Sequence, residues 1–387
     1  MTTFRYFLLD RNSAIEEGTG AWQKFLPTSR ESARGEVPGG GQGTVTRGDY
    51  FKAVRAFLEE PPHHRLADTV SRRIQRPISN TDLDIVDIFL EKHGQFYHPA
   101  KVEAIVAGNA LRFVVNAAFS ATGRTIIETD FRNIRRINRH FPYRFLPRVY
   151  HMGEVRTESG RPSWVLFLGQ WLDGYHEFHL HRSSPDGPVG MVIWDPRRGS
   201  VQLTEKQSVA VYRQAARILT ATYNFTTSEQ VGSWHHAAGD FVLRSSPDID
   251  LKLVTVRQYR PLFDGSMDDM ETLFQALLLF LLNLSVRTRI DRDSGTGDLL
   301  WSEELAVPAT IKGFFEGLEL QVRHGFIPEE LPGIFHSYLK ALSAADLMDL
   351  LAALVARHFA TRAESTLVRQ HLGKHGRCLQ SAIGRNA

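Results

Sequence analysis

Hydrophobic residues recur at helical spacing in the segment before residue 96. Tyr50, Val54 and Phe57 follow one another at intervals of three or four residues, and the hydrophobic residues of 82–90 are spaced in the same way. This spacing places side chains on one face of a helix. The pattern therefore predicts helices over residues 49–95.

The pattern changes to that of β-strands after Pro99. Residues 101–106 and 111–120 are rich in Val, Phe and Ala, and the turn residues 107–109 join them, which predicts a β-hairpin. Two more strands follow at 146–150 and 163–168.

A helix is predicted between these two pairs of strands. Thr125 is followed three residues later by Glu128, the spacing of a capping box at a helix start. Ile127, Phe131 and Ile134 then recur on one face. The predicted order is strand, strand, helix, strand, strand, which makes a small sheet with one helix against it.

The second half of the chain is predicted to be mostly helical. Residues 191–194 and 200–203 form a small hairpin, and Thr204 with Gln207 forms a second capping box at the start of a helix that ends near Asn224. The remaining predicted elements are a hairpin of 241–243 with 251–256 and helices at 268–289, 308–325, 343–361 and up to about residue 372.

These patterns divide the chain into three predicted parts. Residues 1–95 form a helical N-terminal extension, 96–170 a small β-rich lobe, and 171–387 a larger, mostly helical lobe. Within the extension, about 27–47 is rich in Ser, Gly, Glu and Arg, and such a composition buries too little to order itself. A glycine loop for phosphate is the alternative, but no Lys-Ser/Thr pair follows the glycines, so a linker is favoured.

Composition narrows the class of protein and the compartment. The chain has 387 residues, of which 42% are hydrophobic, enough for two or three domains or lobes with cores of their own. Its 46 Lys and Arg nearly balance its 43 Asp and Glu, so the net charge indicates neither nucleic acid nor a membrane surface as a partner. A single cysteine, Cys378, excludes an internal disulfide and suits a reducing cytoplasm.

Neither apolar stretch of the sequence is typical of a targeting or membrane segment. Asp10 and Arg11 interrupt the N-terminal apolar run, so it resembles neither a signal peptide nor an anchor. The most apolar segment, 273–284, has the length of a core helix and is too short to span a bilayer. We therefore expect a cytoplasmic protein without a membrane partner.

The stretch 233–259, SWHHAAGDFVLRSSPDIDLKLVTVRQY, carries polar groups at both ends of a predicted hairpin. His235 and His236 precede it, Asp240 stands where its first strand begins, and Arg257 follows its second strand. A carboxylate at a strand end is held by a rigid element, as a functional group requires.

With this stretch in place, the order of elements over residues 95–360 resembles the protein-kinase-like fold, most closely its aminoglycoside-phosphotransferase and choline-kinase branch. The resemblance implies a two-lobed α+β protein: a small antiparallel sheet with one helix, followed by a larger helical lobe. Family members carry a catalytic loop H-G-D-x-x-x-x-N before the first strand of the hairpin and a metal-binding Asp after the second.

Several family positions hold other residues in this chain. Gly239-Asp240 falls on the glycine and asparagine that close the loop, His235 on the catalytic aspartate, and Arg257 on the metal-binding aspartate. Glu128 or Asp130 would stand at the lysine-pairing glutamate. The strand 111–120, in the place of the lysine strand, contains no lysine.

These departures favour binding over catalysis, because phosphoryl transfer depends on the lysine and the metal-holding carboxylates. The leading hypothesis is a kinase-like protein with an incomplete phosphotransfer site, which binds a small anionic or nucleotide-like ligand, or a protein partner, in the cleft between the lobes. The alternative is an active small-molecule phosphotransferase with ATP and Mg²⁺. In that enzyme His235, with an unperturbed pKa of about 6.5, would be the base and Asp240 the sole metal ligand.

The histidines suggest a third hypothesis, a metal-dependent enzyme. His176, Glu177, His179 and His181 lie within six residues, and His235 with His236 forms a second cluster. Imidazole and carboxylate groups suit a transition metal. In an extended segment, however, His179 and His181 point to one face and His176 to the other, so the first cluster closes around one ion only with a turn.

The acidic segment 286–301 imitates a calcium-binding loop. Asp291, Asp293 and Asp298 are spaced like ligands, but Ser302 stands where the loop requires its glutamate. We therefore expect an ordered turn held by Arg–Asp pairs.

Overall fold

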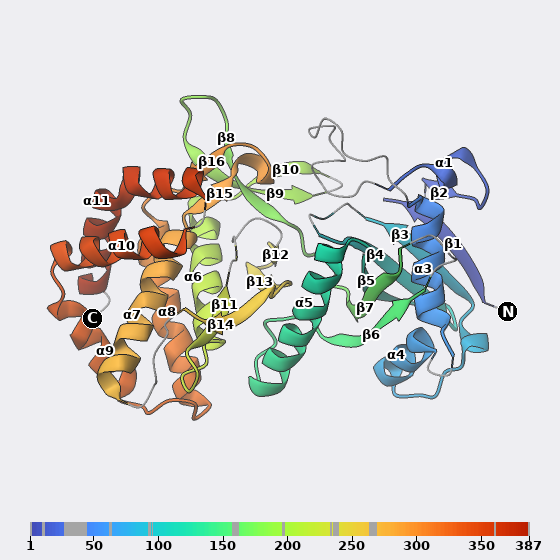
Figure 1. The fold of residues 1–387 in the computed structure, drawn as a ribbon, viewed down its shortest axis with the longest axis horizontal. Helices are drawn as coiled ribbons and strands as arrows, with labels where there is room; N and C mark the ends of the chain where they lie inside the picture. The colour runs from blue at the N-terminus through green and yellow to red at the C-terminus, as the bar shows by residue number, and fades with distance from the viewer. Residues whose placement is uncertain are drawn as a thin grey trace. The chain divides into compact units, whose positions relative to one another are not determined.

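The protein divides into two compact units in a computed structural model (Figure 1). Unit 1 comprises Met1–Arg139 and Pro147–Asp173, and unit 2 comprises His140–Leu146 and Gly174–Ala387. The structure describes residues 2–9, 12–26, 45–61, 64–91, 94, 96–156, 162–195, 198–232, 234, 240–262, 269–359 and 361–385.

Unit 1 is built on a seven-stranded sheet in the order β2-β1-β3-β4-β5-β7-β6. All neighbours are antiparallel except β1 and β3, which are parallel. The strands are β1 (Thr3–Leu8), β2 (Ala14–Ile15), β3 (Ile85–Leu90), β4 (His98–Val106), β5 (Asn109–Ala118), β6 (Val149–Val155) and β7 (Trp164–Gln170). The helices are α1 (Gly20–Gln23), α3 (Arg47–Glu59), α4 (Arg65–Ile74) and α5 (Ala121–His140), with a 3₁₀ turn η1 (Asn80–Asp82).

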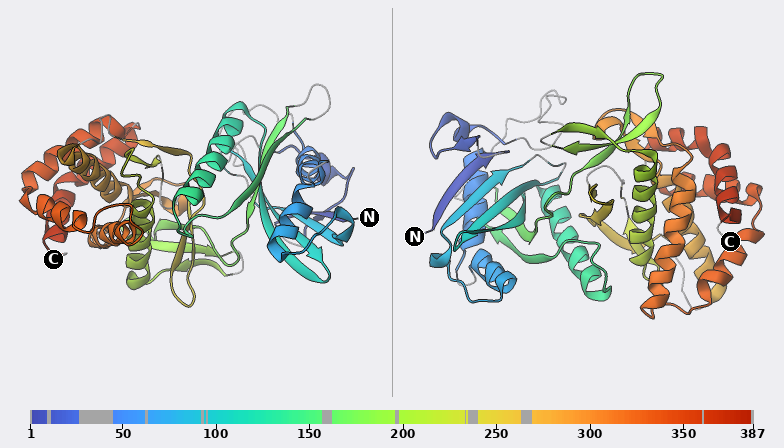
Figure 2. Two further views of the ribbon diagram at one scale, coloured as in Figure 1. Left: turned by 90° about the horizontal axis from the view of Figure 1, so that it is seen from below. Right: turned by 180° about the vertical axis from the view of Figure 1, so that it is seen from behind.

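Helices cover both faces of this sheet, α3 on one and α5 on the other (Figure 2). Strand β7 shows how the sequence achieves this. Trp164 and Leu166 belong to the large core beneath α3, whereas Val165 and Phe167 pack against α5. Because successive side chains of a strand point to opposite faces, an unbroken apolar run is what a strand buried on both faces requires.

The same two-sided burial explains an error in the sequence analysis. Residues 82–90 were expected to form a helix, but Ile85–Leu90 is strand β3, between β1 and β4. Five of its six residues are buried, so its apolar residues are nearly continuous and also fit helical spacing. The segment before residue 96 is therefore not helical throughout, because it supplies three strands of the sheet as well as α3 and α4.

Helix α5 begins five residues earlier than predicted, since a capping box at Thr125 would make Ile126 its first residue. Its first residue is Ala121, and the Ser120 hydroxyl accepts a hydrogen bond from Gly123 N at 3.1 Å. Thr125 lies inside the helix, where its hydroxyl donates to the Ala121 carbonyl. The predicted capping box at Thr125 is wrong, although the predicted apolar face is correct: Ile127 and Phe131 are buried.

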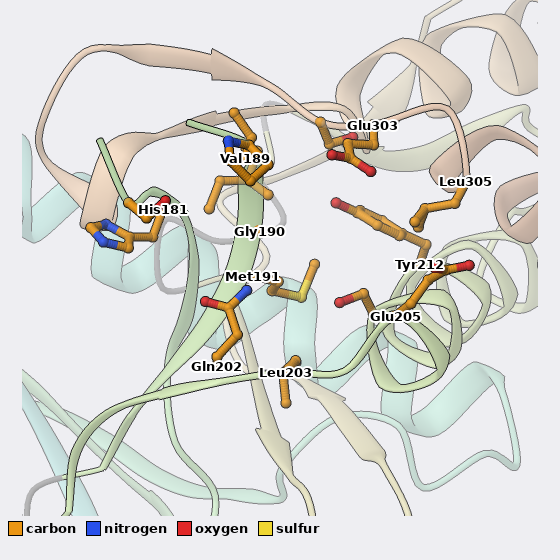
Figure 3. A pocket seen from close by; sticks show the side chains of 15 residues that line it. His181, Val189, Gly190, Met191, Gln202, Leu203, Glu205, Tyr212, Glu303 and Leu305 are labelled. Atoms are coloured by element: carbon orange, nitrogen blue, oxygen red, sulfur yellow. The ribbon is translucent and has the colours of Figure 1, made fainter. Parts of the chain in front are cut away.

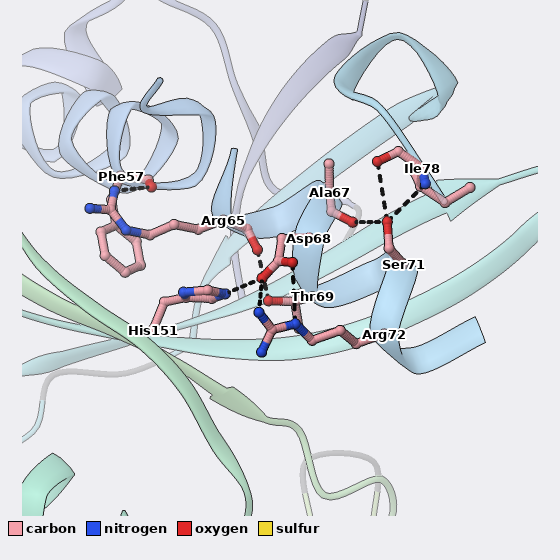
Figure 4. A network of polar contacts seen from close by, with 9 residues as sticks. All are labelled: Phe57, Arg65, Ala67, Asp68, Thr69, Ser71, Arg72, Ile78 and His151. Carbon is pink, nitrogen blue, oxygen red and sulfur yellow. Dashed lines mark hydrogen bonds and ion pairs between the residues drawn. The ribbon is translucent and has the colours of Figure 1, made fainter. Parts of the chain in front are cut away.

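Helix α4 is tied to the edge strand β6 by polar contacts (Figure 4). His151 Nε2 lies 2.8 Å from the Asp68 carboxylate, which also pairs with Arg72. Arg65 donates to the Phe57 carbonyl at 2.9 Å and so joins α4 to α3. Burial lowers the pKa of His151, although Asp68 opposes this shift.

Among its described residues, unit 2 combines short sheets with six helices, five of which are long. Its strands are β8 (Phe178–Arg182), β9 (Val189–Asp195), β10 (Gly199–Gln202), β11 (Glu229–Gly232), β12 (Phe241–Arg244), β13 (Asp250–Leu253), β14 (Gln258–Pro261), β15 (Ile290–Arg292) and β16 (Leu299–Trp301). They form a three-stranded sheet β10-β9-β8 and the pairs β11–β14, β12–β13 and β15–β16. The helices are α6 (Glu205–Ala221), α7 (Met270–Arg287), α8 (Ala306–Arg323), α9 (Leu331–Ala341), α10 (Ala344–His358) and α11 (Arg362–Arg385), of which α9 is the shortest, and a 3₁₀ turn η2 spans Asp293–Gly295.

Most predicted elements of this unit are present. The β9–β10 and β12–β13 hairpins and helices α6, α7, α8 and α10 lie near their predicted positions. Helix α9 was not predicted, and α11 runs to Arg385 rather than to about residue 372.

Helices α6 and α8 pack closely because α8 presents glycines to α6. A Cβ atom at Gly313 would lie 2.0 Å from the Arg213 carbonyl oxygen, so only glycine fits there. Further along α8, Gln321 Nε2 donates to the carbonyls of Ala221 and Tyr223 at 2.7 and 2.9 Å. One side chain of α8 thus caps the C-terminal end of α6.

Helix α7 (Met270–Arg287) is the one helix of the described residues that is long and apolar enough to cross a membrane. Of this segment, 61% is buried within the protein, as in a core helix.

The two threonines of the predicted capping boxes provide a stability test. Thr204 caps α6: its hydroxyl accepts from Gln207 N at 3.3 Å, and Gln207 Oε1 accepts from Thr204 N at 2.9 Å. Thr204→Ala should therefore lower the free energy of unfolding by about 1 kcal/mol. Thr125→Ala, inside α5, should change it by at most a few tenths of a kcal/mol. Urea unfolding followed by circular dichroism measures both, and equal losses would contradict these cap assignments.

Candidate functional site

Asp240 lies at the start of β12, where the sequence placed it, and is 1% exposed. Arg257 Nη1 lies 2.7 Å from Asp240 Oδ1. The Thr255 hydroxyl donates to the same carboxylate oxygen. The sequence analysis expected Asp240 and Arg257 to lie near each other, and in the structure they form an ion pair.

Strand pairing brings these groups together. Phe241 pairs with Leu253 across the β12–β13 hairpin, and Val254 N donates to the Asp240 carbonyl at 2.8 Å. The residues just beyond β13 therefore pass beside Asp240. Arg257 and Thr255 come from this segment, so one short hairpin holds the acid and both partners.

Thr255 was missed by the sequence analysis. It stands between β13 and Arg257 and is 9% exposed. The available signal was its position: a lone hydroxyl residue directly after a strand whose partner begins at a carboxylate. Hydroxyl groups at such positions often bond to a nearby acid, which lowers the cost of burying the charge.

The pairing changes what Asp240 can do chemically. A magnesium site requires carboxylate oxygens that are open to the ion. Here one oxygen of a buried carboxylate already accepts from a guanidinium and a hydroxyl, and the side chain of Arg257 is only 21% exposed. A metal ion at Asp240 would have to share the carboxylate with Arg257 and would meet its positive charge.

The predicted partners His235 and His236 lie outside the described residues. The neighbouring Trp234 is 2% exposed, and its ring meets Phe241 edge to face at 6.1 Å. The convergence of His235 with Asp240 and Arg257 in a cleft between the lobes stays a prediction.

In unit 1, the two candidate acids of α5 have different surroundings. Glu128 lies on the outer side of the helix, 3.6 Å from Arg132 one turn away. Asp130 is completely buried and accepts a hydrogen bond from the Tyr97 hydroxyl at 3.0 Å. Of the two, Asp130 is therefore the acid held inside the unit.

Strand β5 contains no lysine, but Lys101 lies on the adjacent strand β4. Lys101 of β4 pairs with Val114 of β5. Its ammonium lies 3.3 Å from Glu91, 3.7 Å from Glu103 and 4.2 Å from the centre of the Phe89 ring. The positive charge is thus on this sheet, but carboxylates already accompany it.

The histidines at and before β8 have different partners. His179 and His181 both reach residues 291–293, at 3.7 Å from Asp291 and 3.0 Å from Asp293. His176 instead forms backbone hydrogen bonds with Leu243, at 2.8 and 2.9 Å. The prediction that His179 and His181 share a face is confirmed.

His179 is a buried histidine between two acids. Its Nε2 lies 4.0 Å from Glu177, its Nδ1 lies 3.7 Å from Asp291, and the residue is 5% exposed. Burial alone would lower its pKa, but Asp291 and Glu177 outweigh burial and raise the pKa above its usual value. Asp291 and Glu177 therefore favour the protonated form of the His179 ring.

The 290–301 segment forms a hairpin that packs against β8. Asp291 accepts a hydrogen bond from Leu180 N at 2.8 Å. Gly295, with φ of +80°, lies directly on the His179 ring, because a Cβ there would be 2.5 Å from a ring carbon. The expected ordered turn is present, but histidines and backbone groups of β8, not arginines, hold its Asp291 and Asp293.

Among the described residues, no group of three or more His, Cys, Asp or Glu is arranged to hold a metal ion. In the β8 cluster the reason is geometric: each ring nitrogen of His179 faces a different acid. The second cluster, His235 with His236, lies outside this part of the chain.

Comparison with protein-family models gives no match, and comparison with curated protein sequences gives none. Among solved structures, the chain is similar to "WaaP in complex with acyl carrier protein". The identity is 12%, the TM-score is 0.29, and the match covers 76% of this chain and 97% of that one. At this identity and TM-score the similarity assigns neither a fold, nor residues, nor an activity. The architecture itself is mixed α+β, with an N-terminal sheet and a mainly helical C-terminal part.

The raised pKa of His179 should appear in the pH dependence of stability. Its folded-state pKa is raised above the unfolded value of about 6.5. The resulting stabilisation is complete below that unfolded value and disappears as the pH rises through the folded-state pKa. The difference in free energy of unfolding between wild type and His179→Gln should therefore be largest below about pH 6 and should shrink at alkaline pH.

Urea unfolding across the pH range measures this difference. His181→Gln is the matched control, because the His181 side chain is 40% exposed and should contribute less at every pH. A difference for His179→Gln that grows with pH would contradict the charged assignment.

Proposed function

We propose that this chain is a kinase-like protein that acts by binding rather than by phosphoryl transfer. The ligand would be a small anionic or nucleotide-like molecule, or a protein partner. The observation that carries the proposal is the ion pair between buried Asp240 and Arg257.

The argument follows the charges that phosphoryl transfer needs. Magnesium ions held by carboxylates and a lysine neutralise the phosphates during transfer. At Asp240, Arg257 supplies the compensating positive charge itself, so the carboxylate has no need of a metal ion. In unit 1, β5 has no lysine, and Lys101 on β4 already has Glu91 and Glu103 beside it.

An active phosphotransferase with rearranged chemistry is the second candidate. It would use His235 as the base and Asp240 as its sole metal ligand, with ATP and Mg²⁺. The pair with Arg257 counts against this candidate, because a divalent ion beside a guanidinium would meet a like charge.

A His/carboxylate metal-dependent enzyme is the third candidate. His179 argues against it, because its two nitrogens face Asp291 and Glu177 separately rather than a common point. Metal analysis of the purified chain, with His179→Ala as the comparison, tests this candidate directly.

Nucleotide titration with and without Mg²⁺ tests the proposal. We expect no magnesium-dependent turnover of ATP by the wild-type chain, and any nucleotide binding should be of similar strength with and without Mg²⁺. Arg257→Ala should make binding more dependent on Mg²⁺, because it leaves Asp240 without that guanidinium.

Turnover of ATP that requires Mg²⁺ and is abolished by Asp240→Asn would overturn the proposal in favour of the phosphotransferase. Asp87→Asn serves as a control, since it removes a buried carboxylate of unit 1 that pairs with Arg5 rather than the one beside Arg257.

A further inference from the structure

The three-stranded sheet β8–β9–β10 has an open edge at β10. All four residues of β10 are exposed, and within the described residues β9 is the one strand that pairs with β10. Leu203 N, just beyond β10, donates to the Met191 carbonyl of β9 at 2.8 Å. Because the direction of backbone hydrogen bonds alternates along an antiparallel strand, the N–H and C=O groups of Ser200 and Gln202 point away from β9. Each of these two residues therefore leaves one donor and one acceptor on the open edge.

The other edge of the same sheet is closed. On β8, Leu180 N donates to the Asp291 carboxylate at 2.8 Å, and just before β8, His176 exchanges two backbone hydrogen bonds with Leu243 of β12. In unit 1, the edge strand β6 is interrupted by a register irregularity. Covered or irregular edges discourage pairing with other chains. Strand β10 instead has a regular register with β9, and its sequence, GSVQ, contains no proline or charged residue.

The side chain of Gln202 leaves this edge uncovered. Its amide lies against Gly190 of β9, where a Cβ atom would be 2.1 Å from Gln202 Nε2 (Figure 3). Glycine at position 190 thus leaves room for the amide. The side chain folds back over its own sheet rather than across the open edge.

Two large hydrophobic side chains are exposed on the β9–β10 hairpin. Trp194 of β9 is 57% exposed and Val201 of β10 is 38% exposed. Trp194 stands directly opposite Ser200, so both side chains share one face of the sheet. A strand added beside β10 would lie two strand spacings, about 10 Å, from Trp194, with the small Ser200 between them. An aromatic side chain on that strand would span this gap and meet the indole ring.

The charges at the two ends of β10 differ in sign. Arg198, just before the strand, is exposed. Beyond the strand, Glu205 and Glu303 line the same cavity as Gln202, and none of the described lining residues is a lysine or arginine (Figure 3). Lys206, in the same turn of α6, is exposed but does not line this cavity. A strand antiparallel to β10 begins beside the acidic end and finishes beside the basic one, so a basic first residue and an acidic last residue complement these charges.

We propose that the β10 edge binds an extended peptide segment of a partner protein, which joins the sheet as a fourth strand antiparallel to β10. The backbone groups of Ser200 and Gln202 supply the hydrogen bonds, as in other complexes formed by strand addition. An aromatic residue of the peptide opposite Ser200 contacts Trp194, and charged residues at its two ends meet Glu205 and Arg198. This surface is separate from the buried ion pair of the proposed function, so peptide binding and nucleotide binding are tested independently.

A synthetic heptapeptide with blocked ends, KTTVYTE, tests the proposal on the full chain. In the antiparallel register its third, fourth and fifth residues stand opposite Gln202, Val201 and Ser200. We expect saturable binding in calorimetric titration with up to about 1 mM peptide. Methylation of the third backbone nitrogen, which faces β10, should weaken binding at least about tenfold, whereas methylation of the fourth, which faces away, should change it less than about threefold. Absence of binding, or equal weakening by the two methyl groups, would overturn the proposal.

Protein variants then locate the binding. Ser200→Pro removes an N–H that points away from β9, so the hairpin keeps its own hydrogen bonds while the peptide loses one. It should weaken binding about tenfold, whereas the matched control Ser200→Ala, which keeps this N–H, should change it less than about threefold. Trp194→Ala should weaken binding severalfold, and unchanged binding would overturn the aromatic contact. Circular dichroism confirms that each variant is folded. Equal effects of Ser200→Pro and Ser200→Ala would contradict strand addition at β10.

Sedimentation of the chain without peptide tests another occupant of the edge, a second copy of this chain. We expect wild type and Ser200→Pro to sediment as the same species. A wild-type dimer that Ser200→Pro dissociates would assign the edge to a second copy and contradict the proposal.

Discussion

The burial of Asp240 is the constraint on which the account depends. A carboxylate that is almost fully removed from water is unfavourable unless other groups compensate its charge and its hydrogen bonds. The β12–β13 hairpin meets this requirement locally, since its pairing carries Thr255 and Arg257 past the acid. Thr255 and Arg257, which compensate for the burial of Asp240, are also the groups that bind one of its carboxylate oxygens. The folding requirement therefore brings a guanidinium and a hydroxyl to one oxygen of this carboxylate.

Unit 1 also buries acids, and there arginines on neighbouring strands of the sheet pair with them. Asp87 on β3 is fully buried and pairs with Arg5 on β1 at 2.6 Å. On β4, Glu103 stands beside Asp87 and pairs with Arg112 on β5 at 3.0 Å. Register alone places these side chains side by side, because directly opposite residues of neighbouring strands share a face. Both units therefore hold buried acids next to arginines supplied by strand pairing.

Features that depend on neighbouring residues were predictable from the sequence. The capping box of Thr204 and Gln207 is confirmed, as is the buried face of α5, since each is determined within one or two helical turns. The β12–β13 hairpin is also confirmed. Strand β3 was not predictable from spacing, because burial on both faces of a sheet gives the same apolar run as a buried helix.

Contacts between segments that are far apart in the sequence were what the sequence analysis mainly missed. Nothing in the sequence near residue 291 indicates that Asp291 accepts from β8 or that Gly295 covers His179, since these segments are more than a hundred residues apart. The sequence analysis expected Arg–Asp pairs in this turn because arginines lie near the aspartates in the sequence. At the candidate site, Asp240 and Arg257 were identified because one short hairpin joins them. Thr255 was overlooked because its role depends on the burial of Asp240.

A double-mutant cycle between Asp240 and Arg257 tests the central claim most directly. The free energies of unfolding of wild type, Asp240→Asn, Arg257→Gln and the double variant give the coupling energy between the two side chains. For a buried ion pair we expect a coupling of about 2 kcal/mol, with the double variant more stable than the sum of the single losses implies. A coupling near zero would mean that the guanidinium does not stabilise the carboxylate, and the account of Asp240 as an occupied acid would be wrong.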